Sequence, residues 1–345
     1  MKTRNSKSEI QCAETGAVAG GRPGLKISRW IRIFSVVLFS CLNAAGSDQT
    51  VEMDHPFRFG FSIALMPDVN ENDARAAMKV WADAIIKNGA VRADPNVLMF
   101  HDFASMSDDL QNRIVDGVAT TTIGFFAIQK QVEFNHFVFG ATDGSIFDEY
   151  VLLVHQDSSL TNIEDLRGRT LNIQKHTRTC LALVWLDTLL MEKGLRPAQD
   201  FCGRVNEESK LTQAVLPVFF HKADACLVTR KGFKTMCELN PQVGRQLRVL
   251  ATSPEFVAAG FFFRTGYPRT QQERCLSEFT RVHTNPTGQQ ILTVFQTDRL
   301  EEHPASVMDS ALALLGRHRH LLGETNSLQT TPVSPAHVAT NGGVQ

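Results

Sequence analysis

Residues 150–173 read YVLLVHQDSSLTNIEDLRGRTLNI and hold two strand signals with a short capped segment between them. The uninterrupted apolar run over residues 150–154 is typical of a strand buried on both faces. Residues 159–169 predict a short capped helix and a turn, and residues 170–173 predict the next strand. A strand, a helical connection and a further strand in this order indicate an α/β layer.

The clearest helix follows directly, over residues 179–193. Its inward face recurs at helical spacing through Leu181, Val184, Trp185, Thr188 and Leu189. Gly194 ends the helix, because glycine accepts the left-handed turn that closes one. Residues 174–180 therefore lie between a strand end and a helix start, which is where α/β proteins place ligand sites.

The same alternation of short apolar runs and helical stretches extends in both directions. Upstream, residues 57–64 predict a strand and residues 71–87 a helix that ends at Asn88-Gly89. Downstream, residues 223–228 predict another strand. The pattern predicts an α/β protein with parallel strands, built as two βα layers.

Charge and length limit the possible functions. The chain has 345 residues, with 35 Lys and Arg against 36 Asp and Glu, and a formal net charge of −1. No basic block attracts nucleic acid, so we expect no nucleic-acid partner. The length suits two domains or one large two-part unit, each part able to bury its own core.

The first 46 residues differ from the rest and predict an export signal. They carry seven Lys and Arg but only two acidic residues, and the apolar run Ile33–Phe39 is followed by the small residues Ala44-Ala45-Gly46. About seven apolar residues are too few to cross a bilayer, which needs roughly 20. We expect a signal peptide over residues 1–46, a periplasmic protein, and at most a weak lipoprotein signal at Cys41. Residues 323–345 are polar and predict a disordered tail.

Enzyme signatures are missing from the sequence. It contains no GxSxG, GxGxxG, P-loop or HExxH pattern, and we expect no catalytic residues, cofactor or metal. The cysteines after the expected signal peptide are Cys180, Cys202, Cys226, Cys237 and Cys275. Their spacing does not reveal a disulfide pairing, although one pair among Cys202, Cys226 and Cys237 is possible.

The strongest chemical signal is KHTRTC over residues 175–180. Hydroxyls and cations at a helix start can join the unpaired N–H groups there to form an anion site. The alternative is that Thr177 or Thr179 only caps the helix while the bases face water. The spacing by itself does not decide between them.

Three stretches resemble the phosphate, phosphite and phosphonate substrate-binding proteins of ABC transporters. They are Asp157–Thr170, which is similar to the family's DSPI–xLxDLKGKT stretch, Lys222–Ala225, and Leu250–Pro254 followed by Phe263-Arg264. The resemblance implies a type 2 periplasmic-binding-protein fold of two βα lobes joined by a two-crossing hinge. Placed on this sequence, the resemblance implies lobe 1 over 51–145 plus 253–320 and lobe 2 over 146–252.

The resemblance also implies a site at a helix start, where a Ser-Thr-Ser-Gly turn grips phosphonate oxygens in the family. The implied ligand-binding residues are Thr177, Arg178, Thr179, Phe103, Lys210 and Lys231. Acidic positions that meet an amine in some members fall on Lys231 and Ala259. A cleft rich in cations (Lys175, Arg178, Lys210 and Lys231) and poor in acids disfavours an aminoalkylphosphonate and favours a compact oxyanion.

The function that follows is that of an exported, monomeric, non-enzymatic protein that captures a small oxyanion of the phosphate, phosphite or phosphonate type for an ABC permease. Alternatives remain: the same module can report to a membrane sensor kinase, or can be a ligand-free protein-interaction domain. An enzyme with Cys180 as nucleophile is the weakest alternative, since neither His176 nor His221 can be shown to approach it.

Overall fold

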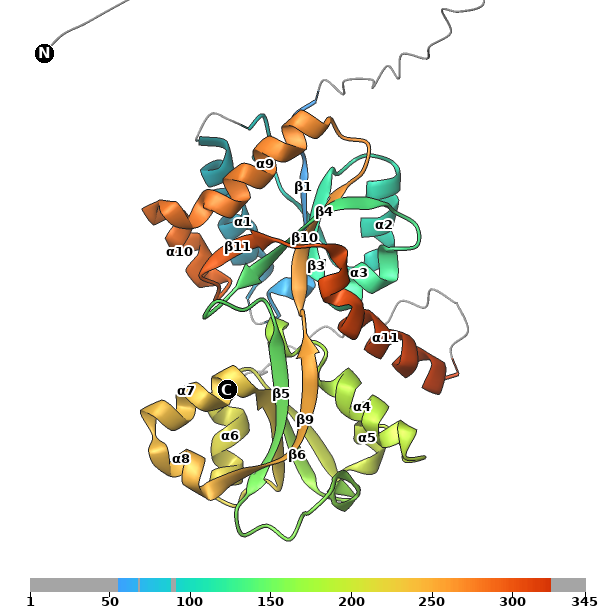
Figure 1. The fold of residues 1–345 in the computed structure, drawn as a ribbon, viewed down its shortest axis with the longest axis vertical. Helices are drawn as coiled ribbons and strands as arrows, with labels where there is room; N and C mark the ends of the chain where they lie inside the picture. Colours follow the sequence, from blue (N-terminus) through green and yellow to red (C-terminus); the bar gives the residue numbers. More distant parts are fainter. Residues whose placement is uncertain (1–54, 68, 88–90, 324–345) are drawn as a thin grey trace, which may run out of the picture. The chain divides into compact units, whose positions relative to one another are not determined.

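The computed structural model describes residues 55–67, 69–87 and 91–323, and Figure 1 shows how their helices and strands are arranged. They form two mixed sheets with helices packed against both. Within these residues no helix is both long enough and apolar enough to cross a bilayer. The signal peptide expected over 1–46 and the tail expected over 323–345 lie, except for Gly323, outside the described residues.

The first sheet has six strands among the described residues, in the order β11-β4-β10-β3-β1-β2. Their bounds are β1 Phe59–Ser62, β2 Leu98–Phe100, β3 Gly117–Thr121, β4 Phe134–Ala141, β10 Ala259–Arg264 and β11 Arg299–Glu302. β1 pairs with β2 and β3 in parallel, whereas β10 and β11 are antiparallel to their neighbours. The expectation of parallel strands therefore holds for part of this sheet only.

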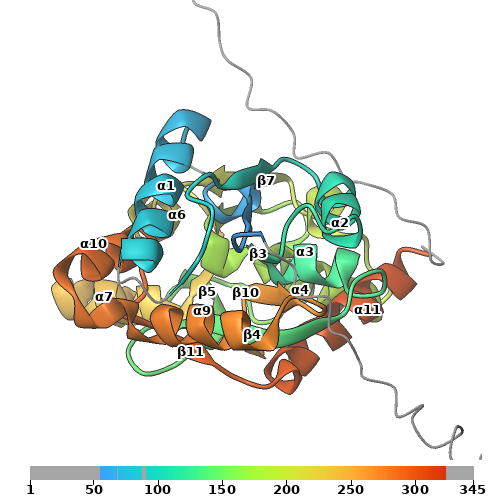
Figure 2. The same cartoon turned by 90° about the horizontal axis from the view of Figure 1, so that it is seen from above.

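Helices cover both faces of the first sheet, because successive side chains of a strand point to opposite faces. On β3, Ala119 joins the core beneath α1 (Glu71–Lys87) and α9 (Arg269–Arg281). Its neighbour Val118 joins a separate core with α2 (Phe103–Gln111) and α3 (Thr122–Ile128). Figure 2 shows α1, α9 and α10 (Pro286–Val294) apart from α2 and α3.

The second sheet has five strands among the described residues, in the order β7-β6-β8-β5-β9. Their bounds are β5 Asp148–His155, β6 Thr170–Gln174, β7 Arg204–Glu208, β8 Ala225–Thr229 and β9 Leu247–Phe256. β6 is parallel to β7 and β8, but β5 is antiparallel to both β8 and β9. The apolar run over 150–154 is buried on both faces as predicted.

The helices of the second sheet pack against both of its faces. They are α4 Ala182–Glu192, α5 Ala198–Phe201, α6 Leu211–Phe219, α7 Arg230–Leu239 and α8 Pro241–Gln246. The helix expected over 179–193 begins later, since residues Thr177–Thr179 form a separate 3-10 turn, η3. This turn determines the geometry of the site.

The chain passes between the sheets after β4, after β9 (Figure 1) and again after β11. Asp143 and Gly144, in the first connection, both have positive φ, of 53° and 74°. A small core at the crossings contains Ile146, Val257 and Met308.

The last helix corrects one sequence boundary. Residues up to 320 were assigned to lobe 1, but α11 (Asp309–Leu321) buries Ala311, Leu314 and Leu315 in the core of the second sheet. Its apolar face packs mainly against α4 and also contacts α3 of the first sheet. The chain therefore returns to the second sheet after β11.

Candidate functional site

The turn before α4 is held by its own side chains. The Arg178 N–H donates to Nδ1 of His176 at 3.1 Å, and the His176 N–H donates to Oγ1 of Thr179 at 3.0 Å. The Thr179 hydroxyl itself donates to the Gln174 carbonyl at 2.6 Å, and the residue is 5% exposed. Thr179 thus caps the turn from inside, as one of the two sequence interpretations proposed.

Thr177 connects this turn to the first sheet. Its Oγ1 donates to the carbonyl of Leu65 at 2.7 Å. Leu65 belongs to η1 (Ile63–Leu65), which directly follows β1. Both threonine hydroxyls expected to face an anion therefore have a carbonyl partner, and this differs from the picture of two free hydroxyls at a helix start.

Arg178 reaches out of the turn to three partners on three segments. Its Nη1 lies 3.2 Å from Oδ2 of Asp148, the first residue of β5. Its Nη2 donates to the Thr142 hydroxyl and, at 2.8 Å, to the Gln296 carbonyl. Asp148 is 2% exposed, so burial raises its pKa, while the charges of Arg178 and Lys231 act against that rise.

Lys231, in α7, binds the connection between β4 and β5. Its Nζ donates to the carbonyl of Thr142 at 2.9 Å and to that of Ser145 at 3.4 Å. Among the described residues Lys231 makes no ion pair, although it lies near enough to influence Asp148. Two cations, Arg178 and Lys231, thus face one buried carboxylate.

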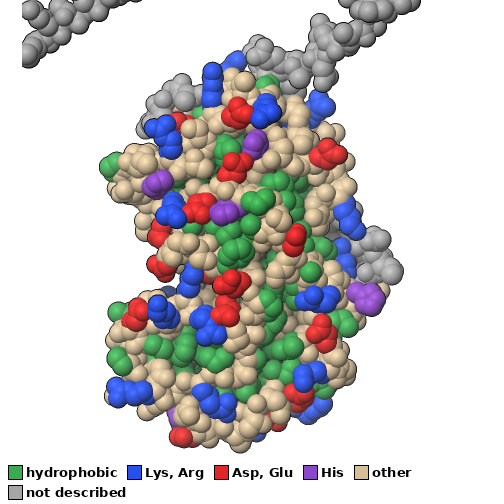
Figure 3. All heavy atoms as spheres, viewed as in Figure 1, with side chains coloured by type: hydrophobic (Ala, Val, Ile, Leu, Met, Phe, Trp, Pro, Cys, Tyr) green, Lys and Arg blue, Asp and Glu red, His purple; other side chains and the backbone are tan. Residues whose placement is uncertain are grey.

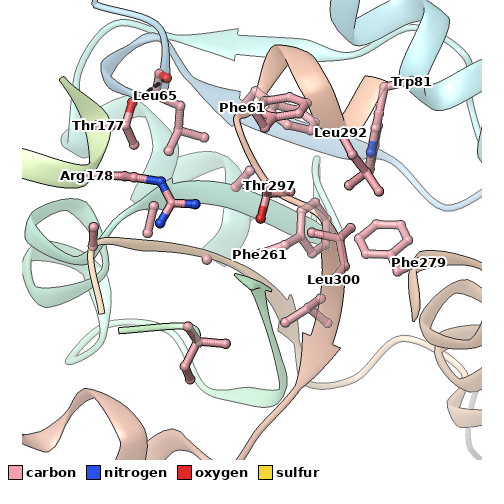
Figure 4. A pocket seen from close by; sticks show the side chains of 18 of the residues that line it. Phe61, Leu65, Trp81, Thr177, Arg178, Phe261, Phe279, Leu292, Thr297 and Leu300 are labelled. Atoms are coloured by element: carbon pink, nitrogen blue, oxygen red, sulfur yellow. Dashed lines mark hydrogen bonds between the residues drawn. The ribbon is translucent and has the colours of Figure 1, made fainter. Parts of the chain in front are cut away.

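A cavity of ≈ 160 Å³ opens beside Arg178, with walls from both sheets. Its polar wall includes Asp148, Thr177, Arg178 and Thr297. Figure 4 shows the guanidinium of Arg178 pointing into this cavity, opposite a cluster of aromatic and aliphatic side chains. In Figure 3 the molecular surface is hollowed at its left edge, between the regions of α10 and α7.

The structure brings together only some of the residues expected at the site. Thr177 and Arg178 line the cavity, as does Ala259. Phe103 packs with the α2 and α3 core, on the opposite face of the first sheet from the cavity. Lys210 is the exposed N-cap residue of α6. Thr179, Phe103, Lys210 and Lys231 do not belong to the cavity lining, and their role in binding stays a prediction.

Asp148 corrects the expectation of a cleft poor in acids. This carboxylate lies in the cavity wall and was not singled out in the sequence, because an acid within an apolar strand carries no signal of its own. Lys175, which was counted among the cations of the cleft, is instead paired with Glu207 at 2.7 Å on the surface. The argument against an amine-carrying ligand is correspondingly weaker.

The sequence analysis also did not predict the aromatic half of the cavity. Phe61, Trp81, Phe261 and Phe279 were visible as apolar positions of strands and helices, yet nothing in their spacing separates a cavity wall from a filled core. A high local content of phenylalanine was the available signal.

Cysteine chemistry finds little support in this geometry. Burial raises the pKa of the Cys180 thiol to about 12, and its Sγ donates to the Ala258 carbonyl at 3.3 Å. The five cysteines of the described residues are free thiols, so the pair considered among Cys202, Cys226 and Cys237 does not form. The described residues also hold no cluster of three or more metal-ligating side chains.

The sequence matches the family model described as ABC transporter, phosphonate, periplasmic substrate-binding protein, over residues 63–306. The chain belongs to this family. Membership makes it a transporter substrate-binding protein, a class that is periplasmic and not enzymatic and that works with a small ligand and a membrane permease. A search of curated protein sequences finds no match.

Solved structures support the fold of the family. XAC2383 from Xanthomonas citri, bound to chloride, is 15% identical with a TM-score of 0.54, covering 78% of this chain and 99% of its own. A binding-protein component of an ABC phosphonate transporter from Pseudomonas aeruginosa is 14% identical with a TM-score of 0.52, covering 79% and 90%. PhnD1 from Prochlorococcus marinus, in complex with methylphosphonate, is 13% identical with a TM-score of 0.52, covering 78% and 99%. At these identities the likeness establishes the two-lobed fold.

The residues that carry the family resemblance hold the scaffold together. Asp165 accepts the Asn162 N–H in a capping box at 3.1 Å, and Asp224 accepts the Thr170 N–H at 2.8 Å. Arg264 forms an almost fully buried ion pair with Asp116 at 2.8 Å. These motif residues therefore stabilise the fold, and none of them belongs to the cavity lining.

Proposed function

We propose that this chain is an exported solute-binding protein that holds an oxyanion beside Thr177 and Arg178 and delivers it to an ABC permease. The observation that carries the proposal is the position of Arg178, whose guanidinium points from the second sheet into a cavity walled largely by the first (Figure 4). Family membership supplies the transport role.

The local charges support an anionic ligand. Arg178 and Lys231 both act on Asp148, and a single carboxylate balances only one of them. An oxyanion at the cavity mouth can accept hydrogen bonds from the guanidinium, which has five N–H donors. It can also compete with the Leu65 carbonyl for the hydroxyl of Thr177.

Closure of the two lobes fits the same contacts. The Thr177–Leu65 hydrogen bond and the Arg178 contacts to Thr142 and Gln296 link the second sheet to segments that flank the first. A ligand that touches both walls of the cavity stabilises this arrangement over an open one, because it binds the closed form better. A permease then distinguishes loaded from empty protein by that difference.

One observation favours a second candidate, a ligand-free interaction domain. The hydroxyls of Thr177 and Thr179 already donate to the carbonyls of Leu65 and Gln174, which leaves the turn satisfied without a ligand. In this alternative the lobes are kept and binding is lost.

A thermal-shift screen separates the two. Phosphate, phosphite, sulfate, methylphosphonate and aminoethylphosphonate are added in turn over a concentration series, because a ligand of the native state raises Tm progressively. The proposal expects at least one oxyanion to raise Tm, with a smaller rise in Arg178→Gln/Asp148→Asn. No rise with any of them at millimolar concentration contradicts oxyanion binding and favours the ligand-free domain.

A further inference from the structure

The cavity beside Arg178 is apolar over most of its depth. Its inner wall is formed by Phe61, Trp81, Phe261, Phe279, Leu292 and Leu300. These side chains come from six elements, β1, α1, β10, α9, α10 and β11, and surround one space in Figure 4. The charged groups, Asp148 and Arg178, lie together at the other end. The cavity therefore has a charged end and a long apolar end.

The apolar wall is rigidly packed. Trp81 meets Phe61 and Phe279 in edge-to-face contacts, with ring centroids 5.0 Å apart in each pair. The ring centroids of Phe261 and Phe279 lie 4.8 Å apart, again edge to face. Such packed aromatic contacts fix the ring positions, so the space between them is a built feature of the core rather than a gap that side chains can readily fill.

The volume of the cavity suits a small apolar group. At ≈ 160 Å³, its charged end included, the cavity is comparable in volume to an engineered apolar cavity of about 150 Å³ that binds benzene. Inorganic phosphate or phosphite would satisfy Arg178 and leave this space empty. An apolar substituent on the anion would fill this space and would thereby be removed from contact with water.

From these observations, and resting on the proposed function, we infer that the ligand is an organic oxyanion with an apolar tail about the size of a phenyl ring or short alkyl chain. The head lies at Arg178 and Thr177, and the tail lies in the cavity against the wall that Phe61, Trp81 and Phe279 form. This ligand class is an amphiphilic phosphonate or related acid, in contrast to a bare inorganic anion.

Isothermal titration of the full chain tests the inference with a graded set of probes: phosphate, methylphosphonate, propylphosphonate, phenylphosphonate and the neutral benzyl alcohol. We expect affinity to rise by about fourfold for each buried methylene, and phenylphosphonate to bind at least about tenfold more tightly than methylphosphonate. Phosphate or methylphosphonate binding as tightly as phenylphosphonate overturns the apolar tail and leaves the proposed function intact. Benzyl alcohol binding as tightly as phenylphosphonate overturns the anionic head, and with it the proposed function.

Two matched variants locate the tail. Leu300 and Leu98 are half-buried leucines on the two opposite edge strands of the same sheet, but only Leu300 lines the cavity. Leu300→Phe should weaken phenylphosphonate about tenfold and leave methylphosphonate nearly unchanged, because it fills the tail space, whereas Leu98→Phe should change neither. Equal effects of the two variants on phenylphosphonate contradict a tail in this cavity, and circular dichroism of each variant confirms that it is folded.

Discussion

The guanidinium of Arg178 lies 3.2 Å from the carboxylate of Asp148, and both side chains line the same cavity. Their side chains are 18% and 2% exposed, so the pair is largely removed from solvent. The sequence predicted Arg178 as a ligand contact and did not single out Asp148. The pair orients the guanidinium, and it joins the turn before α4 to the start of β5.

Removing one member of this pair should destabilise the fold. We expect Arg178→Gln to lower the free energy of unfolding by about 3 kcal/mol, because it removes the ion-pair partner of the buried Asp148 carboxylate. The double variant Arg178→Gln/Asp148→Asn should recover most of that loss, since it removes both members of the pair. Urea unfolding of the wild type and both variants measures this, and a double variant as unstable as the single one contradicts it.

The pH dependence of stability should carry a contribution from Asp187 of α4. Burial raises the pKa of this carboxyl to about 6, while the Ala198 N–H that it accepts at 2.7 Å works against the rise. The folded form then binds a proton more strongly than the unfolded chain does. Its stabilising contribution is present below about pH 4 and is lost as the pH rises through about 6, with a total on the order of 3 kcal/mol.

Asp187→Asn isolates this contribution. The amide keeps an oxygen for the Ala198 N–H but does not titrate, so the variant should gain stability over the wild type as the pH rises from 4 to 7. His318, 4.0 Å away, and Asp200 also face this carboxyl, so the comparison is made by urea unfolding at each pH against His318→Gln as a control. A stability difference between Asp187→Asn and wild type that stays constant with pH would exclude the effect.

The ion pair between Arg264 and Asp116 should matter for stability and not for binding. Asp116 is fully buried and also accepts from Arg58 at 3.2 Å, and it directly precedes β3, outside the cavity lining. We expect Asp116→Ala to cost about 3–5 kcal/mol of unfolding free energy, because it strands the buried Arg264 cation. Arg269→Gln, which breaks an exposed pair with Glu273, should cost less than about 1 kcal/mol.

Cys180 should react poorly with alkylating reagents in the native protein. Its pKa of about 12 leaves almost no thiolate at neutral pH, and its Sγ is bound to the Ala258 carbonyl. Iodoacetamide at pH 7.5 followed by peptide mass mapping should label it slowly in the native protein and fully in urea. Rapid native labelling of Cys180 would instead reopen the possibility of a nucleophilic cysteine.

Local patterns in the sequence predicted much of the fold. The apolar run over 150–154 is buried as predicted. The helix face around Trp185 buries Leu181 and Thr188 but leaves Val184 and Leu189 half-buried. The helix over 71–87 forms, yet of its predicted face Trp81 is buried whereas Val80 is 52% exposed. The antiparallel direction of β5 could not be predicted this way, because an apolar run carries no information about the direction of its neighbours. The packing of α11 against α4 could not be predicted either, since a helix face does not identify which sheet it will cover.

The site was less predictable than the fold. Thr177 and Arg178 were found because a helix start has a local signature, and the structure places both in the cavity wall. Asp148, Trp81 and Phe279 come from distant parts of the chain and meet only through the tertiary fold. The positions matched to the family by order along the chain, such as Phe103 and Lys210, lie outside the cavity lining.

The most direct measurement of the central claim compares phenylphosphonate binding by wild type and by Arg178→Gln/Asp148→Asn in isothermal titration. The double variant removes the guanidinium while leaving the net charge of the pair unchanged. Loss of one hydrogen bond to a charged donor, worth ~1.5–3 kcal/mol, should weaken binding by about 10- to 150-fold. A folded double variant that binds phenylphosphonate within about twofold of the wild type, on the same scale, would contradict the assignment of Arg178 as the anion contact.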